Sequence, residues 1–334
     1  MMSDECDKFD LADDDDNGSR LRNVSTFRSY LELMRFPNVF TAMADVAMGF
    51  LFVQSDNVQP WAPTAWDYAT LATLVAASSL LYIAGMVLND VFDVAIDREE
   101  RPERPIPSGR VSLDAARRLG WRLLVLGVAL GSCAVFFTGQ LRCGVVAAIL
   151  ATAILLYDAW LKRTPLGPLA MGACRTLNVM LGMSAVDASL RPEQWLVAGA
   201  IGIYVAGVTL FARKESQRSS RPQLAAATLV MMLGVAMLAW LPHWPDRLVP
   251  LLQWDPKRWH ILTGVLAMLI GWRCLRAIAT PIPSRVRIAV AHSILSLVML
   301  DAVACYATRG LFWAGMILLL LVPTMLLGQW IETT

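Results

Sequence analysis

The sequence predicts an all-α, polytopic membrane bundle of nine or ten transmembrane helices. Of its 334 residues, 56% are hydrophobic and only 17% are charged, and the mean hydropathy is +0.51. Soluble chains carry about 25% charged residues, so these values exclude a water-facing globule. The apolar residues also gather in long runs, and a run of about 20 is the length that a helix needs to cross a bilayer.

The chain begins with a polar segment, residues 1–29, that we expect to be a disordered tail. It is strongly acidic, with four consecutive aspartates at 13–16, and it has no apolar periodicity. It also lacks the basic start and apolar run of a signal peptide. We therefore expect the membrane domain to comprise residues 30–334.

Ten apolar segments are long enough to be spans, and nine spans remain an alternative because the first and the last two segments are the weakest. The expected spans are 38–54, 68–90, 121–138, 142–159, 168–187, 195–212, 223–241, 259–279, 286–307 and 311–330. Most of the 29 lysines and arginines lie in segments on the same side of the membrane as the N-terminus. The positive-inside rule then predicts a cytoplasmic N-terminus and cytoplasmic long loops at 91–120 and 213–222.

The second expected span ends in the segment Asn89-Asp90-Val91-Phe92-Asp93-Val94-Ala95-Ile96-Asp97. On a helix Asn89, Asp93 and Asp97 lie four residues apart on one face, and Asp90 borders that face. Carboxylates so close to a membrane are costly unless a positive charge offsets them. Magnesium prefers such oxygen ligands and usually joins them to substrate phosphates. The pattern therefore predicts a Mg²⁺ and diphosphate site; the alternative is a solvated helix end paired with nearby arginines.

The loop that follows contains Arg101-Pro102-Glu103-Arg104-Pro105-Ile106-Pro107-Ser108-Gly109-Arg110. Three prolines exclude an ordinary helix and stiffen the loop. Its arginines suit a lid over an anion. The alternative is a plain connector between two helices.

Together these motifs resemble the UbiA-type intramembrane prenyltransferases. The resemblance rests on Asn89-Asp90-x-x-Asp93-x-x-x-Asp97, on Arg104-Pro105-Ile106-Pro107-Ser108-Gly109, and on Tyr157 followed by Lys162 after the fourth span. The segments Thr209–Glu215 and Arg101–Pro107 are similar to the divergent EboC-like branch of that family.

The resemblance implies a helical bundle around a central cavity that opens to the lipid of a bacterial inner membrane. It implies Mg²⁺-dependent transfer of an isoprenyl group from a prenyl diphosphate to an acceptor that contains a ring. By this resemblance Asp90, Asp93 and Asp97 are the catalytic acids, and with Asn89 they hold the metal. Asn89 also contacts the substrate. Further substrate contacts would come from Arg104, Tyr157 and Lys162.

The family's second motif, D-x-x-x-D, is eroded in this chain. Glu215 is its one remaining carboxylate and a candidate metal ligand, and Ser219 stands four residues later. Arg213 and Lys214 are candidates for direct phosphate contacts that would replace metal charge. A basic cytoplasmic loop without a catalytic part is an equal alternative.

The fifth expected span contains Arg175 and Asn178 on one helical face with Gly172 and Gly182. An arginine inside a span usually faces the bundle interior or a watery cavity. We expect Arg175 to pair with Asp158, Asp93 or the diphosphate, and a structural ion pair is the alternative. Asn178 is expected to join helices or contact the acceptor, and the glycines to allow close packing.

Mg²⁺-dependent prenyl transfer is the function that this sequence predicts. A transporter of a cation or isoprenoid lipid would need acids distributed through the membrane depth, whereas these cluster at one end. A non-catalytic prenyl-diphosphate binder is the third hypothesis, because the second motif is eroded. The chain has no clustered basic face, so we expect no nucleic-acid partner.

Overall fold

The computed structural model describes residues 26–54, 62–186, 189–213, 219–243 and 256–332, and every regular element within these ranges is a helix. Residues 26–33 form the first helical segment. The longer elements that follow are α2 (Val39–Val53), α3 (Ala65–Phe92), α4 (Val94–Glu100), α5 (Leu113–Cys133), α6 (Val135–Thr138), α7 (Arg142–Ala159), α8 (Gly167–Met183), α9 (Pro192–Ala212), α10 (Arg221–Trp240), α11 (Pro256–Ala279), α12 (Pro283–Arg309), α13 (Leu311–Leu318) and α14 (Leu321–Glu332). Three short 3₁₀ turns are η1 (Phe36–Asn38), η3 (Leu161–Arg163) and η4 (Leu241–His243).

Nine helical segments in the described ranges are long and apolar enough to cross a membrane. They correspond to nine of the ten expected spans, and the tenth, 168–187, forms α8. With 17 residues, α8 is at the lower limit of length for a spanning helix. The chain is therefore an integral, multi-pass membrane protein, and the predicted all-α bundle is confirmed.

Two boundaries differ from the sequence expectation. Residues 26–29, expected to be part of the disordered tail, are helical, and Ser29 is buried; residues 1–25 lie outside the described ranges. The last span, 311–330, divides into α13 and α14. Pro323 has no N–H to continue the helical ladder and its ring crowds the preceding turn, so the helix breaks just before it.

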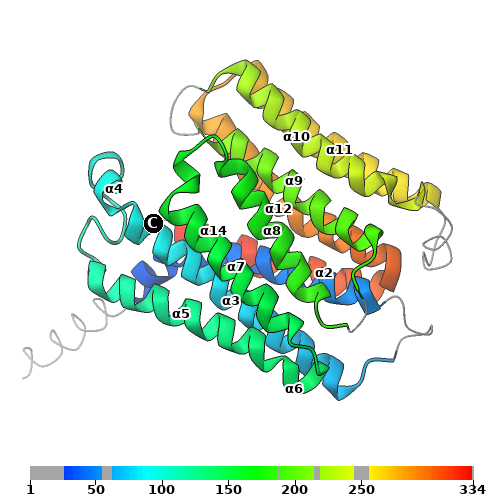
Figure 1. Cartoon of the computed structure of the whole chain (residues 1–334). Coiled ribbons are helices and arrows are strands. Elements are labelled where there is room, and N and C mark those ends of the chain that lie inside the picture. The colour runs from blue at the N-terminus through cyan, green and yellow to red at the C-terminus, as the bar shows by residue number, and fades with distance from the viewer. Residues whose placement is uncertain (1–25, 55–61, 187–188, 214–218, 244–255, 333–334) are drawn as a thin grey trace, which may run out of the picture.

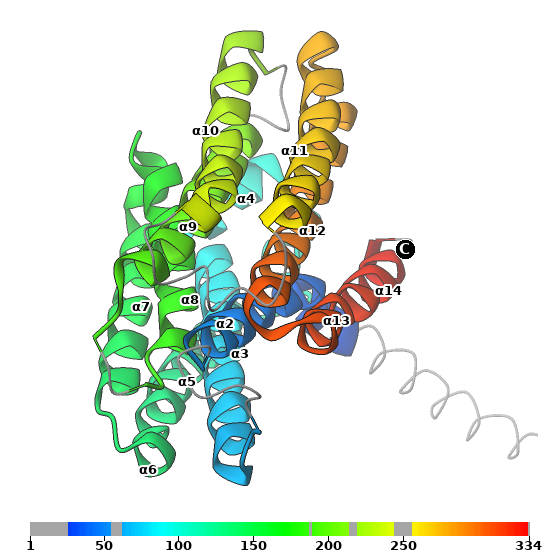
Figure 2. The same cartoon turned by 90° about the vertical axis from the view of Figure 1, so that its right-hand side faces the viewer.

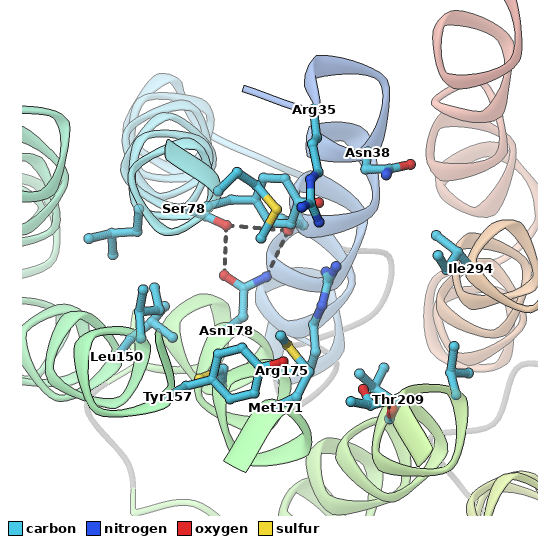
Figure 3. A pocket seen from close by; sticks show the side chains of 18 of the residues that line it. Arg35, Asn38, Ser78, Leu150, Tyr157, Met171, Arg175, Asn178, Thr209 and Ile294 are labelled. Atoms are coloured by element: carbon cyan, nitrogen blue, oxygen red, sulfur yellow. Dashed lines mark hydrogen bonds between the residues drawn. The ribbon is translucent and has the colours of Figure 1, made fainter. Parts of the chain in front are cut away.

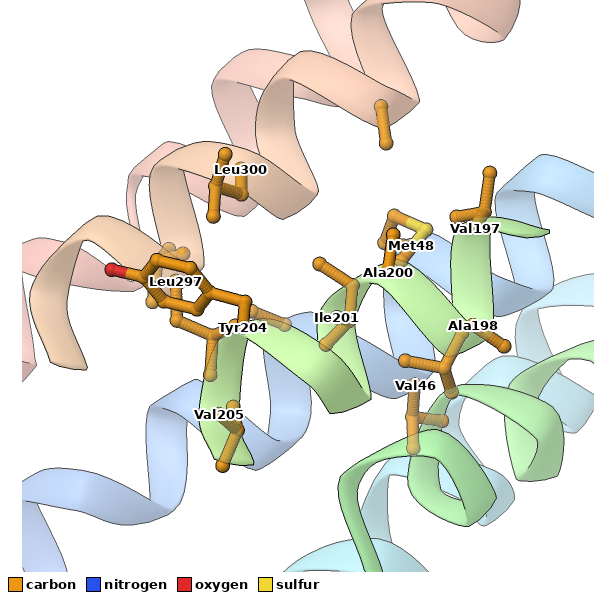
Figure 4. Close-up of a cluster of buried hydrophobic side chains, with 14 of the residues drawn as sticks. Val46, Met48, Val197, Ala198, Ala200, Ile201, Tyr204, Val205, Leu297 and Leu300 are labelled. Atoms are coloured by element: carbon orange, nitrogen blue, oxygen red, sulfur yellow. The ribbon is translucent and has the colours of Figure 1, made fainter. Parts of the chain in front are cut away.

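The bundle is arranged around α2, which packs against α3, α8 and α12 (Figures 1 and 2). The α10–α11 hairpin forms one edge of the bundle, and α5 covers α3 toward the other edge. Buried apolar side chains of α2, α9 and α12, among them Val46, Ile201 and Leu297, form part of the core (Figure 4). Tyr204 lies in this cluster, and its buried hydroxyl donates to the Ser293 carbonyl at 2.8 Å.

Glycines bring α8 close to its neighbours, as the sequence predicts. A Cβ atom at Gly182 would collide with the Val46 carbonyl of α2. A Cβ at Gly172 would come 2.5 Å from the Gly202 carbonyl of α9. These contacts fix α8 between α2 and α9 and so determine which residues its polar face meets.

The acidic segment and the proline-rich loop lie together at one end of the bundle, where α4 projects (Figure 1). The loop folds back on itself, with the Val111 N–H donating to the Pro105 carbonyl at 2.9 Å. Arg110 fastens it to the first helix through two bonds to Glu32, at 2.7 and 3.1 Å. The loop is therefore ordered and covers this end of the bundle.

Candidate active site

Two pockets adjoin each other near this end of the bundle. An apolar pocket of about 280 Å³ lies between α2, α3, α7, α8, α9 and α12 (Figure 3). A polar pocket of about 450 Å³ lies beside α4, η3 and the start of α8. Four residues line both of them: Arg35, Tyr157, Thr209 and Ala212. The two pockets together make a compartment with one charged and one apolar half.

The polar pocket carries an excess of positive charge. Within the described residues its wall has three acids, Asp93, Asp97 and Glu100. Six bases also line it: Arg35, Arg101, Arg104, Lys162, Arg163 and Arg213. Such a wall attracts an anion of several negative charges.

Asn89, Asp93 and Asp97 line the polar pocket together, as their spacing predicts. The helix axis breaks at Asp93, between α3 and α4. The four-residue spacing survives this break, because the Asp93 N–H donates to the Asn89 carbonyl at 3.0 Å and the Asp97 N–H to the Asp93 carbonyl at 2.8 Å. Three oxygen-bearing side chains therefore share one wall.

Basic side chains engage these acids. Lys162 Nζ lies 2.8 Å from Asp93 Oδ2, and Arg163 Nη2 lies 3.3 Å from Asp93 Oδ1. Arg104 Nη1 lies 2.7 Å from Asp97 Oδ2. Arg104 and Lys162, which the resemblance assigns to the diphosphate, are thus in the polar pocket and next to the acids.

Asp90 is buried and, unlike Asn89, Asp93 and Asp97, it lines neither pocket. Its Oδ1 is 3.3 Å from Arg104 Nη1 and 3.4 Å from Arg35 Nη2. One residue after Asn89 on a helix, it points about 100° away from the face that carries Asn89 and Asp93. Its carboxylate therefore holds two arginines at the edge of the pocket.

Arg35 is a site residue that the sequence analysis missed. Its backbone is left-handed, at φ 45° and ψ 46°. Residues other than glycine rarely adopt this conformation, and those that do are often found at functional sites. It lines both pockets and also a third pocket between η1, α12 and α14. Its one signal in the sequence is a basic residue immediately before the first span.

Arg175 and Asn178 line the apolar pocket, not the polar one. Arg175 donates to Asp45 Oδ2 at 2.8 Å and to Thr41 Oγ1 at 3.0 Å. The expected pairing of Arg175 with Asp158 or Asp93 is therefore wrong, and the alternative of a structural ion pair is confirmed, with Asp45 as the partner. The close approach of α8 and α2 turns Arg175 toward Asp45, away from the acidic end of α3.

Asn178 joins three helices, which is the first of the two roles expected for it. Its Nδ2 donates to the Ala42 carbonyl at 2.9 Å and to Asp45 Oδ2 at 3.1 Å. Ser78 Oγ donates to Asn178 Oδ1 at 2.6 Å, one of the bonds drawn in Figure 3. The amide thereby connects α8 with α2 and α3 along one wall of the apolar pocket.

The region of the eroded second motif contributes Arg213. This residue lines the polar pocket and donates to the Thr164 carbonyl at 3.1 Å. Lys214 and Glu215 lie outside the described residues. Tyr157, at the end of α7, stands at the junction of the two pockets.

The oxygen ligands on the polar wall fit a magnesium ion that also binds phosphate. No three His, Cys, Asp or Glu side chains among the described residues come close enough together to hold a metal on their own. Magnesium does not require this, because it keeps several waters and usually takes one or two carboxylates together with phosphate oxygens. Asn89, Asp93 and Asp97 supply ligands of that kind.

The comparisons with known proteins agree with this arrangement. The sequence model of the UbiA prenyltransferase family matches residues 42–280. The digeranylgeranylglyceryl phosphate synthase of Methanosarcina barkeri is 33% identical over 165 residues, 48% of this chain and 55% of that protein. The protein of the same name from Ignicoccus hospitalis is 35% identical over 171 residues, 50% of this chain and 48% of that protein. The chain spans about half the length of the curated relatives it matches.

Solved structures share the fold. A structure of a digeranylgeranylglyceryl phosphate synthase superposes with a TM-score of 0.58 at 20% identity, over 86% of this chain and 99% of that one. A UbiA homologue from Archaeoglobus fulgidus bound to DMAPP and Mg²⁺ gives 0.53 at 15% identity, over 82% and 99%. Because the family match extends over more than half of its length, this chain belongs to the UbiA prenyltransferase family.

Proposed function

We propose that the protein transfers an isoprenyl group from a prenyl diphosphate to an acceptor in the membrane, with the help of Mg²⁺. The observation that supports this most strongly is the junction of a cationic pocket with an apolar one at Arg35, Tyr157, Thr209 and Ala212. A prenyl diphosphate has the same two halves. Its charged group matches the polar pocket and its hydrocarbon chain matches the apolar one.

The reaction breaks the bond between the allylic carbon and the diphosphate oxygen, and the acceptor forms a new bond to that carbon and loses a proton. Negative charge develops on the departing diphosphate. Arg104, Lys162, Arg163 and Arg213 line the pocket in which this charge appears, so they would stabilise the leaving group. Bound Mg²⁺ would neutralise part of the same charge.

We assign the metal contacts to Asn89, Asp93 and Asp97, because these residues line the polar pocket. Asp90 acts differently in this proposal: it holds Arg35 and Arg104 in place. Glu215 and Lys214 remain candidates for a second metal or phosphate contact. The basic partners of Asp93 and Asp97 would turn from the carboxylates to the phosphate when substrate and metal arrive.

The apolar pocket would receive the prenyl chain and keep water from the reacting carbon. Its wall is formed mainly by side chains such as Leu81, Met86, Leu150 and Ile154. An allylic cation reacts readily with water, so exclusion of water favours transfer to the acceptor. Because Arg175 is paired with Asp45, its charge is compensated at one place, and most of this wall is apolar.

The acceptor is proposed to reach the site from the lipid. A third pocket, of about 630 Å³ between η1, α12 and α14, shares Arg35, Asn38, Val290 and Ile294 with the apolar pocket. Relatives named digeranylgeranylglyceryl phosphate synthase favour a lipid phosphate as acceptor, and a ring compound is the other candidate. Both kinds of acceptor could approach through this opening.

The test is turnover by the purified protein in nanodiscs. Labelled prenyl diphosphates of several chain lengths would be combined with glycerol phosphate lipids and ring acceptors, and products identified by mass spectrometry. We expect a prenylated product that requires Mg²⁺. Asp93→Asn should lower the rate at least about 100-fold, and Asp114→Asn, an exposed acid at the start of α5, should not. Binding of prenyl diphosphate without any product would instead indicate a non-catalytic binder.

We further propose that the N-terminus and the site face the cytoplasm. The loops that surround the polar pocket, 93–112 and 160–167, are rich in basic residues, as cytoplasmic loops usually are. In a variant whose six native cysteines are replaced, a cysteine introduced at Ser108 should react with a membrane-impermeant maleimide only after the cells are opened. Labelling in intact cells would contradict this orientation.

A further inference from the structure

We propose that Asp158 is a positioning residue that turns the Asn89 amide so that its oxygen faces the polar pocket. The inference rests on the proposed function, because the oxygen it positions is one of the assigned Mg²⁺ ligands. Asp158 lies in the last turn of α7, between Tyr157 and the turn that carries Lys162. It is 69 residues away from Asn89 in the sequence.

Asp158 is almost completely buried, with 2% of its surface exposed. Its Oδ1 accepts a hydrogen bond from Asn89 Nδ2 at 2.9 Å. Its Oδ2 has no hydrogen-bond partner, and within the described ranges the residue makes no ion pair. Asn89 is therefore the one hydrogen-bond partner of this carboxylate in the described structure.

The packing of α3 against α7 creates this contact. A Cβ atom at Gly85, one turn before Asn89, would lie 3.0 Å from Ile154 and 3.9 Å from Asp158 Oδ2. The absence of a side chain at Gly85 lets the two helices approach, which brings Asp158 within reach of the amide. Asp158 lines neither pocket, and its one hydrogen bond goes to Asn89, so Asn89 is its direct contact with the substrate site.

The chemistry of the two groups determines the direction of the amide. An asparagine side chain has a donating and an accepting end of nearly equal size, so its orientation depends on its hydrogen-bond partners. In the structure the carboxyl of Asp158 accepts from the NH₂ end of Asn89 at 2.9 Å, so this contact selects that end of the amide. The Oδ1 end is then turned away from Asp158. Asn89 lines the polar pocket, where an amide oxygen is a suitable ligand for magnesium.

A buried carboxylate with a single hydrogen bond is costly, because it loses its hydration. A serine or an asparagine at position 158 could bond to Asn89 at lower cost. Either of them could donate as well as accept, and so would not select one end of the amide. Residues behind a metal site commonly orient the metal ligands by hydrogen bonds. Replacing such a residue typically weakens the metal affinity about 10- to 100-fold.

The experiment measures Mg²⁺ affinity without turnover. Binding of an unreactive prenyl thiodiphosphate would be titrated with Mg²⁺ in wild-type protein, Asp158→Asn and Asp158→Leu. We expect the Mg²⁺ concentration at half-saturation to rise about 10- to 100-fold in Asp158→Leu. Asp158→Asn should give a smaller rise, because its amide can present either end to Asn89.

Two further variants separate positioning from a general loss of structure. Glu193→Gln makes the same carboxylate-to-amide change at a buried site in the first turn of α9, and it should leave the Mg²⁺ requirement unchanged. In an Asn89→Ala background, Asp158→Leu should have little further effect. Melting temperatures would confirm that each variant is folded.

The outcomes distinguish this inference from the proposed function. Absence of Mg²⁺-dependent binding in the wild-type protein would overturn the proposed function itself. If the wild-type protein binds, and Asp158→Leu is folded with an unchanged Mg²⁺ requirement, the positioning role of Asp158 is wrong. Additive effects of Asn89→Ala and Asp158→Leu would also contradict it.

Discussion

Arg175 shows how a single charge is retained inside the membrane domain. It is paired with Asp45, which is fully buried, and Asp301 of α12 lies beside Asp45. One Asp45 oxygen and both Asp301 oxygens receive no hydrogen bond from an N–H group or a hydroxyl of the described residues. The arginine is thus the one basic partner that the described structure gives Asp45, and the cluster joins α2, α8 and α12.

Replacement of Arg175 by methionine should destabilise the protein strongly. It would leave Asp45 as an unpaired buried carboxylate, and loss of one member of a buried ion pair typically costs about 3–5 kcal/mol. Thermal melting in detergent would measure the effect. The double variant Arg175→Met/Asp45→Asn should recover much of the loss, because position 45 then carries no carboxylate that needs the arginine. Equal melting temperatures of Arg175→Met and wild-type protein would contradict this view.

The sequence alone indicated which individual residues are unusual but not how they pair. Arg175 stands out as an arginine within a span, yet Asp45 is 130 residues away and the partner depends on which helices touch. The same limit applies to Arg35 and Asp158. Their roles follow from a left-handed backbone and from one hydrogen bond across two helices, and neither of these has a periodic signal.

At the scale of the helices, glycines decide how closely α8 approaches α2. The Cβ of an alanine at Gly182 would collide with the backbone of Val46 and Phe50, which cannot move aside as a flexible side chain could. Gly199 in α9 has open space around it. The two positions form a matched pair, because both are glycines inside membrane helices.

Gly182→Ala should therefore lower the stability by about 1–3 kcal/mol, as overpacking does. Gly199→Ala should leave it unchanged or raise it by up to about 1 kcal/mol, because alanine favours a helix more than glycine does. Melting of the two variants side by side checks both values. A stable Gly182→Ala protein would show that α2 and α8 are less tightly packed than described.

The third pocket, between η1, α12 and α14, is the proposed route of the acceptor. Ala291 is exposed and lines this opening, and Ile288, one turn earlier on α12, is exposed outside it. Ala291→Trp should slow transfer to a lipid acceptor about 10-fold or more by blocking its route, and Ile288→Trp should not. Initial rates in nanodiscs would test this, and equal rates for the two variants would exclude the opening as the route.

Across the whole molecule, the sequence predicted more of the fold than of the site. Long apolar runs identified every described span, because a bilayer imposes a minimum length on a helix. The break before Pro323 and the helical residues 26–29 were missed, since boundaries depend on local contacts.

For the site, the four-residue spacing correctly placed Asn89, Asp93 and Asp97 on one wall. The basic partners of these acids come from η3 and from the proline-rich loop, and only the folded bundle brings them together.

In the proposed function, the acids at the end of α3 bind a prenyl diphosphate through Mg²⁺. Equilibrium binding of an unreactive prenyl thiodiphosphate, with and without Mg²⁺, tests it most directly. We predict saturable binding that weakens at least about 10-fold when Mg²⁺ is removed, and a similar loss in Asp93→Asn even with Mg²⁺ present. Binding that is equally tight without Mg²⁺, or unaffected by Asp93→Asn, would contradict the claim.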